Sequence, residues 1–126
     1  MRNLTGRTLS EKEIQSMIIS AISYLGKVYN VTTGVFAQGS GNQKRFIRTF
    51  PKGTPDLLGF RYSDGKIFFI EVKKEKGLLS CEQKLFREWV LTTEAIYGVA
   101  RSVEDALLII QGKWDSAWDI PGRGEA

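Results

Sequence analysis

The sequence predicts an α/β domain in which helices cover both faces of a mixed central β-sheet. Helical and extended patterns follow one another in the order helix, strand, paired strands, helix, strand, helix, an order typical of such an architecture. An Asp64-Gly65 pair between two apolar segments indicates a tight β-hairpin. The second of these segments, residues 67–70, is apolar on both faces, as expected of a central strand.

The N-terminal half begins with a polar stretch, residues 1–8, which we expect to form a loose arm. A helix follows from about Ser10 to Leu25, because apolar residues recur there at helical spacing and Gly26 ends the pattern. Residues 27–35 are rich in β-forming residue types and predict the first strand. Residues 38–54 are rich in Gly, Ser, Lys and Arg, a composition that predicts a loop.

The C-terminal half contains two further helices and a strand. Ser80 begins the second helix, whose apolar face is expected to comprise Leu85, Phe86, Trp89, Val90 and Ile96. Residues 98–101 predict a short strand, and Ser102 caps a third helix that runs to Ile110 with Asp105 at its third position. Residues 113–126 show no regular pattern and are expected to form an irregular tail of the same single domain.

The composition excludes several classes of active site. The chain has 126 residues and no histidine, which rules out serine and cysteine triads that use imidazole and zinc sites that contain histidine. The single Cys81 cannot form an internal disulfide, so we expect a reducing compartment. No apolar run approaches the length of a membrane span. The net charge of +4 indicates an anionic partner.

The hairpin brings acidic and basic residues together at one end of the predicted sheet. A two-residue turn at Asp64-Gly65 sets Lys73 opposite Asp56 and Glu71 opposite Leu58. Opposite residues share a face, and Glu71 and Lys73 share one by alternation. Two carboxylates that lie close together repel each other unless a cation joins them. The arrangement therefore suits a divalent metal with oxygen ligands and a lysine beside a reacting phosphate.

Four short motifs resemble those of one nuclease family. The sequences Gly53-Thr-Pro-Asp56 and Phe69-Ile-Glu-Val-Lys73 resemble the PD-(D/E)xK nuclease superfamily, whose core is that of restriction endonucleases. The segments Glu11-Lys-Glu-Ile-Gln15 and Lys76-Gly-Leu-Leu-Ser-Cys-Glu-Gln83 make the chain more similar to its VRR-NUC branch, the virus-type replication-repair nucleases. The resemblance spans roughly residues 9 to 110. Each motif alone is weakly specific, and their order along the chain carries the resemblance.

The resemblance implies roles for individual residues. Asp56, Glu71 and the backbone carbonyl of Val72 would bind Mg²⁺ or Mn²⁺, with Glu11 completing the outer shell. Lys73 would position or activate the attacking water, and Gln83 would contact the scissile phosphate or a metal-bound water.

Each of these residues also has a purely structural alternative. Asp56 is a common turn residue, and Glu71 and Lys73 form a plausible buried ion pair. Ser80 and Gln83 match a capping box, as do Ser10 with Glu13 and Thr8 with Glu11. Of the two candidate acids in the first helix we favour Glu11, because Glu11 lies closer to the centre of the apolar face.

The basic residues before Pro55 are expected to contact the DNA backbone at the mouth of the acidic site. They are Lys44, Arg45, Arg48 and Lys52, and Lys74 and Lys76 beyond the site are expected to add to them. Phe46 and Phe50 alternate with these charges and either stack on bases or pack beneath the loop. Residues 39–42 lack the Gly-Lys-Ser/Thr of a phosphate-binding loop, so no nucleotide cofactor is expected.

The resemblance implies a metal-dependent DNA endonuclease. Stand-alone VRR-NUC proteins of phage type resemble Holliday junction resolvases and act as homodimers, so a four-way DNA junction is the expected substrate, in the cytoplasm of a bacterial or phage-infected cell. Two alternatives are a non-catalytic DNA-binding module on the same fold and a restriction-type or flap nuclease. Candidates for a dimer interface are Trp114, Trp118, Tyr97 and Trp89, although Trp89 also fits the core.

Overall fold

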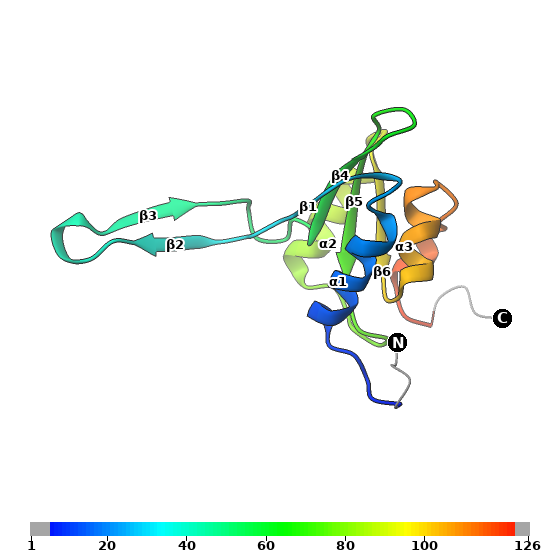
Figure 1. Ribbon diagram of the computed structural model, residues 1–126, viewed down its shortest axis with the longest axis horizontal. Helices are drawn as coiled ribbons and strands as arrows, with labels where there is room; N and C mark the ends of the chain where they lie inside the picture. Colours follow the sequence, from blue (N-terminus) through cyan, green and yellow to red (C-terminus); the bar gives the residue numbers. More distant parts are fainter. Residues whose placement is uncertain (1–5, 123–126) are drawn as a thin grey trace.

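The central sheet has four strands in the order β1-β4-β5-β6. A computed structural model describes residues 6–122, apart from the side chains of Phe36 and Arg48. Its elements (Figure 1) are α1 (Glu11–Ile22), β1 (Gly26–Asn30), β2 (Val35–Gln38), η1 (Gly41–Gln43), β3 (Arg45–Arg48), β4 (Leu57–Arg61), β5 (Ile67–Val72), α2 (Cys81–Val90), β6 (Ile96–Ala100), α3 (Val103–Ile110) and η2 (Ser116–Asp119).

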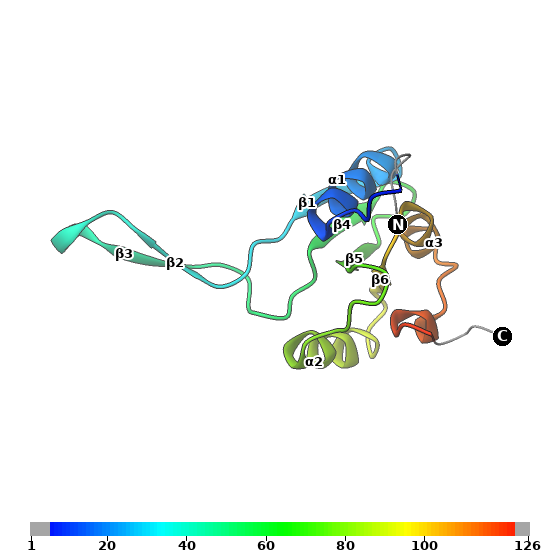
Figure 2. The same cartoon turned by 90° about the horizontal axis from the view of Figure 1, so that it is seen from below.

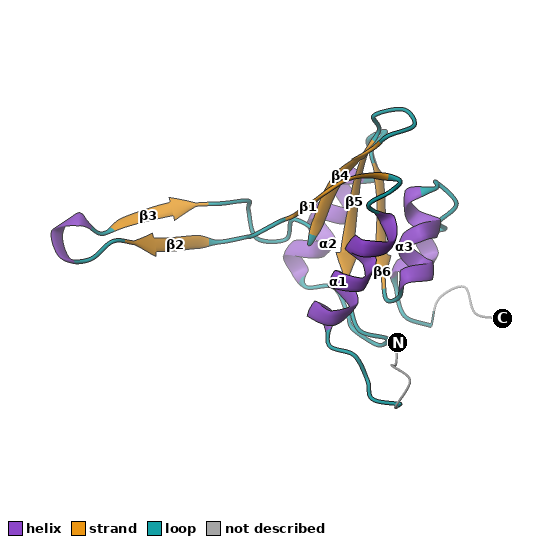
Figure 3. Cartoon of the chain, viewed as in Figure 1, coloured by secondary structure: helices purple, strands orange, loops and turns teal. Residues whose placement is uncertain are grey.

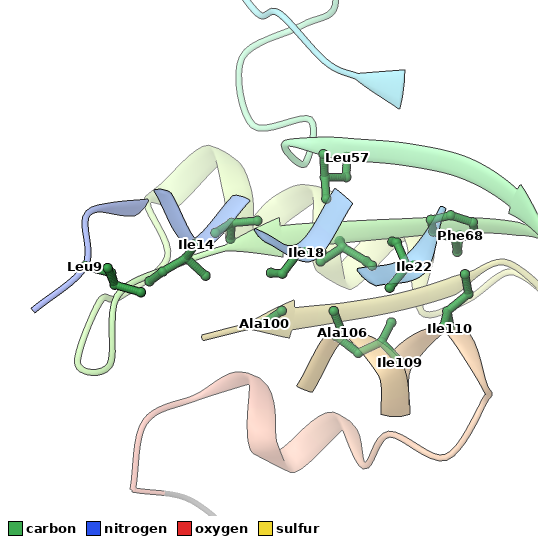
Figure 4. Close-up of a cluster of buried hydrophobic side chains, with 12 residues drawn as sticks. Leu9, Ile14, Ile18, Ile22, Leu57, Phe68, Ala100, Ala106, Ile109 and Ile110 are labelled. Atoms are coloured by element: carbon green, nitrogen blue, oxygen red, sulfur yellow. The ribbon is translucent and has the colours of Figure 1, made fainter. Parts of the chain in front are cut away.

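The strand β5 is central, as its apolar sequence predicts. It pairs antiparallel with β4 and parallel with β6, so the sheet is mixed. Helices α1 and α3 cover one face, and α2 covers the other (Figure 2). The larger core lies under α1 and α3, where Ile14, Ile18 and Ile22 of α1 pack toward the sheet (Figure 4). A smaller core lies under α2, where the rings of Phe69 and Phe86 meet edge to face at 5.1 Å.

The three helices begin where the capping residues predict. Ser10 and Ser80 form complete capping boxes with Glu13 and Gln83, and Ser102 accepts a hydrogen bond from the backbone N–H of Asp105. Helix α1 ends at Ile22 rather than at Leu25, because the Leu25 N–H bonds back to the Ile22 carbonyl in a final turn. None of the described helices is long and apolar enough to cross a membrane.

The hairpin between β4 and β5 has a different register from the one the sequence predicts. Leu57 pairs with Ile70 and Leu58 with Phe69, so the predicted pairings of Lys73 with Asp56 and of Glu71 with Leu58 are wrong by two residues. The turn is longer, because the Asp64 carboxylate binds the Arg61 guanidinium and the Lys66 N–H, and only Gly65 takes a positive φ. A shift of two residues preserves the faces, so the grouping of the acids survives the error.

Residues 31–52, which we call the arm, form a β-hairpin where the sequence predicts the end of a strand and a loop. The arm stands away from the body (Figure 1), and its strands β2 and β3 pair only with each other, with a short 3₁₀ turn at the tip (Figure 3). The predicted strand over residues 27–35 is interrupted because β1 ends at Asn30 and Gly34 adopts φ 111°. Loop composition is confined to the tip, and β-forming residues flank it.

The segment after α3 is attached to the body through Asp119. Asp119 is 0% exposed and accepts hydrogen bonds from the Val99 N–H, Trp114 Nε1 and Arg87 Nε, at 2.9, 2.8 and 2.7 Å. Apart from the 3₁₀ turn η2, residues 113–122 contain no helix or strand, as the prediction of an irregular tail has it. Residues 123–126 lie outside the described part of the chain, as do residues 1–5 of the predicted N-terminal arm.

Two aromatic residues and one isoleucine differ from their predicted settings. Trp89 is 59% exposed rather than part of the core, because α2 turns it away from the sheet. Tyr97 is 6% exposed and belongs to the core under α2, so it is not available to a dimer interface. Ile96 begins β6 rather than extending the apolar face of α2, which ends at Val90.

Candidate functional site

The candidate site lies where β4 begins and β5 ends. Asp56 immediately precedes β4, and its Oδ2 accepts a 2.8 Å hydrogen bond from the Val72 N–H at the end of β5. The Asp56 carbonyl accepts another from the Val31 N–H at 2.8 Å. These two bonds fix the Asp56 carboxylate to the end of β5 and the Asp56 backbone to the segment after β1. A residue that only forms a surface turn would not need these contacts.

Glu71 is the buried acid of the site. It is 2% exposed, and it faces α2, from which Gln83 Nε2 donates a 3.1 Å hydrogen bond to Glu71 Oε1. Its other oxygen, Oε2, is buried and has no hydrogen-bond partner within the described residues. An unsatisfied carboxylate oxygen in the interior costs free energy unless a proton or a cation joins it.

The protonation of Glu71 follows from these surroundings. Burial raises its pKa to about 10, assisted by the neighbouring carboxylate of Asp56 and by the negative charge of Glu11, while the positive charge of Lys73 opposes the rise. Without a cation, Glu71 is therefore protonated at neutral pH. The carboxylates of Asp56 and Glu71 would hold a divalent cation only with Glu71 deprotonated, so binding of such a cation would release that proton.

Lys73 follows the site on the chain and is partly buried. Its backbone N–H donates to the Ala100 carbonyl at 3.0 Å, which fixes its position beside β6. No ion pair joins Lys73 to Glu71 among residues 6–122, although its charge is close enough to lower the pKa of Glu71. The alternative of a closed structural ion pair is thus not observed, and the ammonium group remains available to a ligand.

The two acids at the start of α1 have separate environments. Glu13 completes the capping box with Ser10 and forms an ion pair with Arg7 at 2.7 Å; the hydrogen bond from Arg7, followed by those of Ser10, lowers the pKa of Glu13 to about 2. Glu11 instead turns toward the site, where its Oε2 accepts a 3.4 Å hydrogen bond from the Lys74 N–H. The structure therefore assigns the capping role to Glu13 and brings Glu11 to the site.

Gln83 closes the capping box and also contacts the buried acid of the site. Its Oε1 accepts a 2.8 Å hydrogen bond from the Ser80 N–H, which closes the capping box, while its Nε2 holds Glu71. The loop before the site approaches this helix closely, because a Cβ at Gly53 would lie 2.5 Å from the Glu82 carbonyl oxygen. Gln15 is turned elsewhere and donates to Asn30 Oδ1 at 2.6 Å.

The predicted DNA-contacting residues fall into two groups. Lys74 and Lys76 are exposed beside the site, and Lys52 lies 3.7 Å from Glu82. Lys44 and Arg45 lie at the outer end of the arm rather than at the mouth of the site, because β2 and β3 extend the loop outward. The side chain of Arg48 lies outside the described part of the structure.

One buried polar residue near the site was not anticipated. Asp119 fastens the segment after α3 to β6 and to Arg87 of α2, and so supports the helix that carries Gln83. The local sequence around it shows no periodicity and no motif. Such a residue is recognised only by its burial, because buried carboxylates are rare, and burial is known only once the fold is known.

The donor set fits a hard divalent cation. Within the described residues no three acidic, histidine or cysteine side chains lie close enough together to form a metal site alone, so the carboxylates of Asp56 and Glu71 would be supplemented by the Val72 carbonyl and water. Mg²⁺ commonly binds proteins through one or two carboxylates and keeps several waters. The unpartnered Glu71 Oε2 is the observation that supports this fit.

Comparison with known proteins places the fold. No family model matches the sequence, and no curated protein matches it. A solved structure described as a VRR_NUC domain superimposes with a TM-score of 0.58 at 24% identity, and the match covers 82% of this chain and 97% of that one. The mixed sheet flanked by helices that the sequence predicts is thereby confirmed. The chain has the fold of a VRR_NUC domain.

Proposed function

We propose that this protein is a metal-dependent, structure-selective DNA endonuclease that hydrolyses phosphodiesters with Mg²⁺ or Mn²⁺. The observation that carries the proposal is the buried carboxylate of Glu71, which has one unpartnered oxygen and lies beside the half-buried carboxylate of Asp56. A buried acid of this kind is expensive in a protein interior. Its position at the end of a central strand, followed by Lys73, suits phosphate chemistry.

Each residue of the site has a distinct task in this proposal. Asp56, held by the Val72 N–H, and Glu71, held by Gln83, present oxygens to the cation. Glu11 adds negative charge from α1 without entering the pair. When bound, Mg²⁺ or Mn²⁺ supplies charge neutralisation at the phosphate and lowers the pKa of an attacking water.

Lys73 acts on the reacting groups. Its ammonium group orients the water and offsets the negative charge that develops on the phosphate in the transition state. The water oxygen bonds to phosphorus as the bond to the 3′-oxygen breaks, and a proton from the water reaches that oxygen through solvent. The products are a 5′-phosphate and a 3′-hydroxyl.

The proposed substrate is a four-way DNA junction. Two cuts placed symmetrically across a junction require two active sites related by a two-fold axis, and one chain supplies a single site, so the active form is a homodimer. Trp89 and Trp118 are exposed aromatic residues on the described surface and are candidates for its interface. The setting is the cytoplasm of a bacterial or phage-infected cell.

The decisive experiment is cleavage of a synthetic four-way junction beside plain duplex and flap DNA, with Mg²⁺ or Mn²⁺. Paired nicks across the junction are expected for the wild type and are expected to vanish in Asp56→Asn and Lys73→Ala. Lys113→Ala, an exposed change remote from the site, is the matched control and should cut normally. Binding without any cut would replace the nuclease with a non-catalytic module, and equal nicking of all forms would remove junction selectivity.

A further inference from the structure

The arm holds the entire net charge of the protein. Residues 31–52 contain four of the 18 Lys and Arg residues and none of the 14 acidic residues, so the remaining chain has 14 of each sign. Lys44 and Arg45 lie at its outer end, where no acidic residue is near in sequence. A segment so polarised attracts a polyanion, while the body as a whole does not.

The arm also lacks a partner for its apolar surface. Phe46 is 72% exposed, and Val35 and Ile47 are also among the exposed large hydrophobic residues. An isolated two-stranded hairpin is marginally stable in water. The exposed apolar side chains of the arm belong to neither of the two described cores, so we expect them to contact a partner. Association of two arms would bring like charges together, which disfavours a second copy as the occupant of this surface.

The shape of the arm fits a DNA groove. A two-stranded β-ribbon fits the major groove, which is about 12 Å wide. In the register of β2 and β3, Gln38 and Arg45 lie opposite each other on the same face as Ile47, and Ala37 and Phe46 lie opposite each other on the same face as Val35. Glutamine and arginine side chains donate to base edges and phosphates, whereas the exposed apolar side chains suit contact with thymine methyl groups and sugars.

The length of the arm sets where it would act. About nine residues separate the body from the tip, which at about 3.3 Å per residue gives a reach of about 30 Å. One turn of duplex DNA is about 34 Å long. The arm therefore reaches duplex that lies well beyond the scissile phosphate.

We propose that the arm is a DNA clamp that lies in the major groove of duplex about one helical turn from the site of cleavage. This inference rests on the proposed function only in that the partner is DNA. In this proposal the arm binds the duplex DNA that extends away from the cleavage site, whereas Asp56, Glu71 and Lys73 act on the scissile phosphate. Affinity for a junction should therefore depend on the length of its duplex arms.

The test measures binding of labelled junctions by fluorescence anisotropy in EDTA, so that cleavage does not enter. Duplex arms range from about 8 to about 20 base pairs, from less than one turn to two turns. In the arm variant, an Asn-Gly turn replaces residues 35–48. The replacement uses an existing contact, because the Thr49 N–H already donates to the Gly34 carbonyl at 3.1 Å, as in a two-residue turn.

A charge variant keeps the backbone of the arm intact. Lys44→Ala with Arg45→Ala removes two cations at its outer end, and Lys66→Ala with Lys113→Ala removes two at the opposite end of the sheet as the matched control. We expect the first pair to weaken binding to the longer junctions roughly tenfold to a hundredfold and to reduce the slope of log K against log salt by about 2. The control pair should leave the slope nearly unchanged.

The outcomes separate this inference from the proposed function. Wild-type affinity should rise as the duplex passes one turn, and the rise should vanish in the arm variant. Length-independent binding by the wild type, or equal effects of both charge pairs, would overturn the clamp even if the junction is cut. Dissociation of a dimer by the arm variant with unchanged DNA affinity would assign the arm to a second copy. Absence of cleavage with the length dependence intact would instead overturn the nuclease alone.

Discussion

The end of the sheet and the arm use charge in opposite ways. At the end of the sheet, Glu71 is withdrawn from water, and burial changes its chemistry. On the arm, Lys44 and Arg45 are exposed, and they act at a distance through their charge. A buried charge interacts strongly with its immediate neighbours. Exposed charges attract a polyanion over a longer distance, and that attraction weakens as the salt concentration rises. Substitutions in the two regions should therefore be separable by what they change.

The largest effect is expected from Glu71→Gln. The neutral amide keeps the shape of the side chain but removes an oxygen anion from the proposed metal site, so cleavage should fall by about a thousandfold or more. DNA affinity in EDTA should change less than about threefold, because the residue is buried and has almost no exposed surface to offer DNA. Rates under single-turnover conditions and anisotropy measure the two quantities. A large loss of affinity with normal cleavage would reverse the roles of the two regions.

A smaller effect is expected from Gln83→Ala. Loss of the hydrogen bond to Glu71 should weaken Mn²⁺ binding roughly tenfold to a hundredfold, as is usual when a residue that orients a metal ligand is removed. Ser80→Ala is the control, because it removes the other half of the same capping box and should cost about 1 kcal/mol of stability without changing Mn²⁺ affinity. Calorimetric titration with Mn²⁺ distinguishes them. Equal losses of Mn²⁺ affinity would mean that Gln83 acts only by capping α2.

The raised pKa of Glu71 predicts how stability depends on pH in the absence of metal. The folded protein retains a proton that the unfolded chain releases near pH 4.5, so this contribution to stability is complete below that pH. It is then lost as the pH rises toward about 10, by as much as about 1.4 kcal/mol per pH unit.

Urea denaturation in EDTA between these limits measures the effect. Glu71→Gln should flatten the dependence, because the amide has no proton to release. Saturating Mn²⁺ should stabilise the wild type most at high pH, where the metal no longer competes with the proton. Identical pH profiles for the wild type and the variant would refute the protonated state of Glu71.

The smallest effect is expected from Phe46→Ala on the arm. Because the ring is exposed, the free energy of unfolding should change by less than about 0.5 kcal/mol. Phe68→Ala, at a fully buried ring in the body, should cost about 3–5 kcal/mol. Urea denaturation compares the two phenylalanines directly. A cost above about 1 kcal/mol for Phe46→Ala would mean that the arm packs against the protein in solution.

Most of the body could be predicted because local signals and tertiary packing agree there. The apolar sequence of β5 marks a central strand, and Ser10, Ser80 and Ser102 mark the starts of the helices. The predicted hairpin register is wrong because hydrogen bonds from Arg61 and the Lys66 N–H to the Asp64 carboxylate stabilise a longer turn. Which turn type forms depends on side-chain contacts of this kind. The acids still met, since a shift of two residues keeps every side chain on its face.

The features that could not be predicted depend on contacts distant in sequence. The sequence predicts a loop for residues 38–54, and so for most of the arm, because Gly, Ser and basic residues at the tip outweigh the short β-forming segments on either side. Asp119 was missed because its partners, Val99 and Arg87, come from two other elements. The choice between Glu11 and Glu13 was favoured by helix geometry, and the contacts of each with Lys74 and Arg7 agree with it.

The hydrogen bonds of Asp119 affect the whole of α2, including its N-terminal end. Gln83 and Arg87 are one helical turn apart and so lie on the same side of α2. The first is attached to Glu71 and the second to the buried Asp119, at 3.1 and 2.7 Å. Two attachments on one side oppose rotation of the helix about its own axis, the movement that would swing the amide of Gln83 away from the acid. The carboxylate of Asp119, in a stretch of sequence that shows no motif, thereby helps to hold the Gln83 amide toward Glu71 at the candidate site.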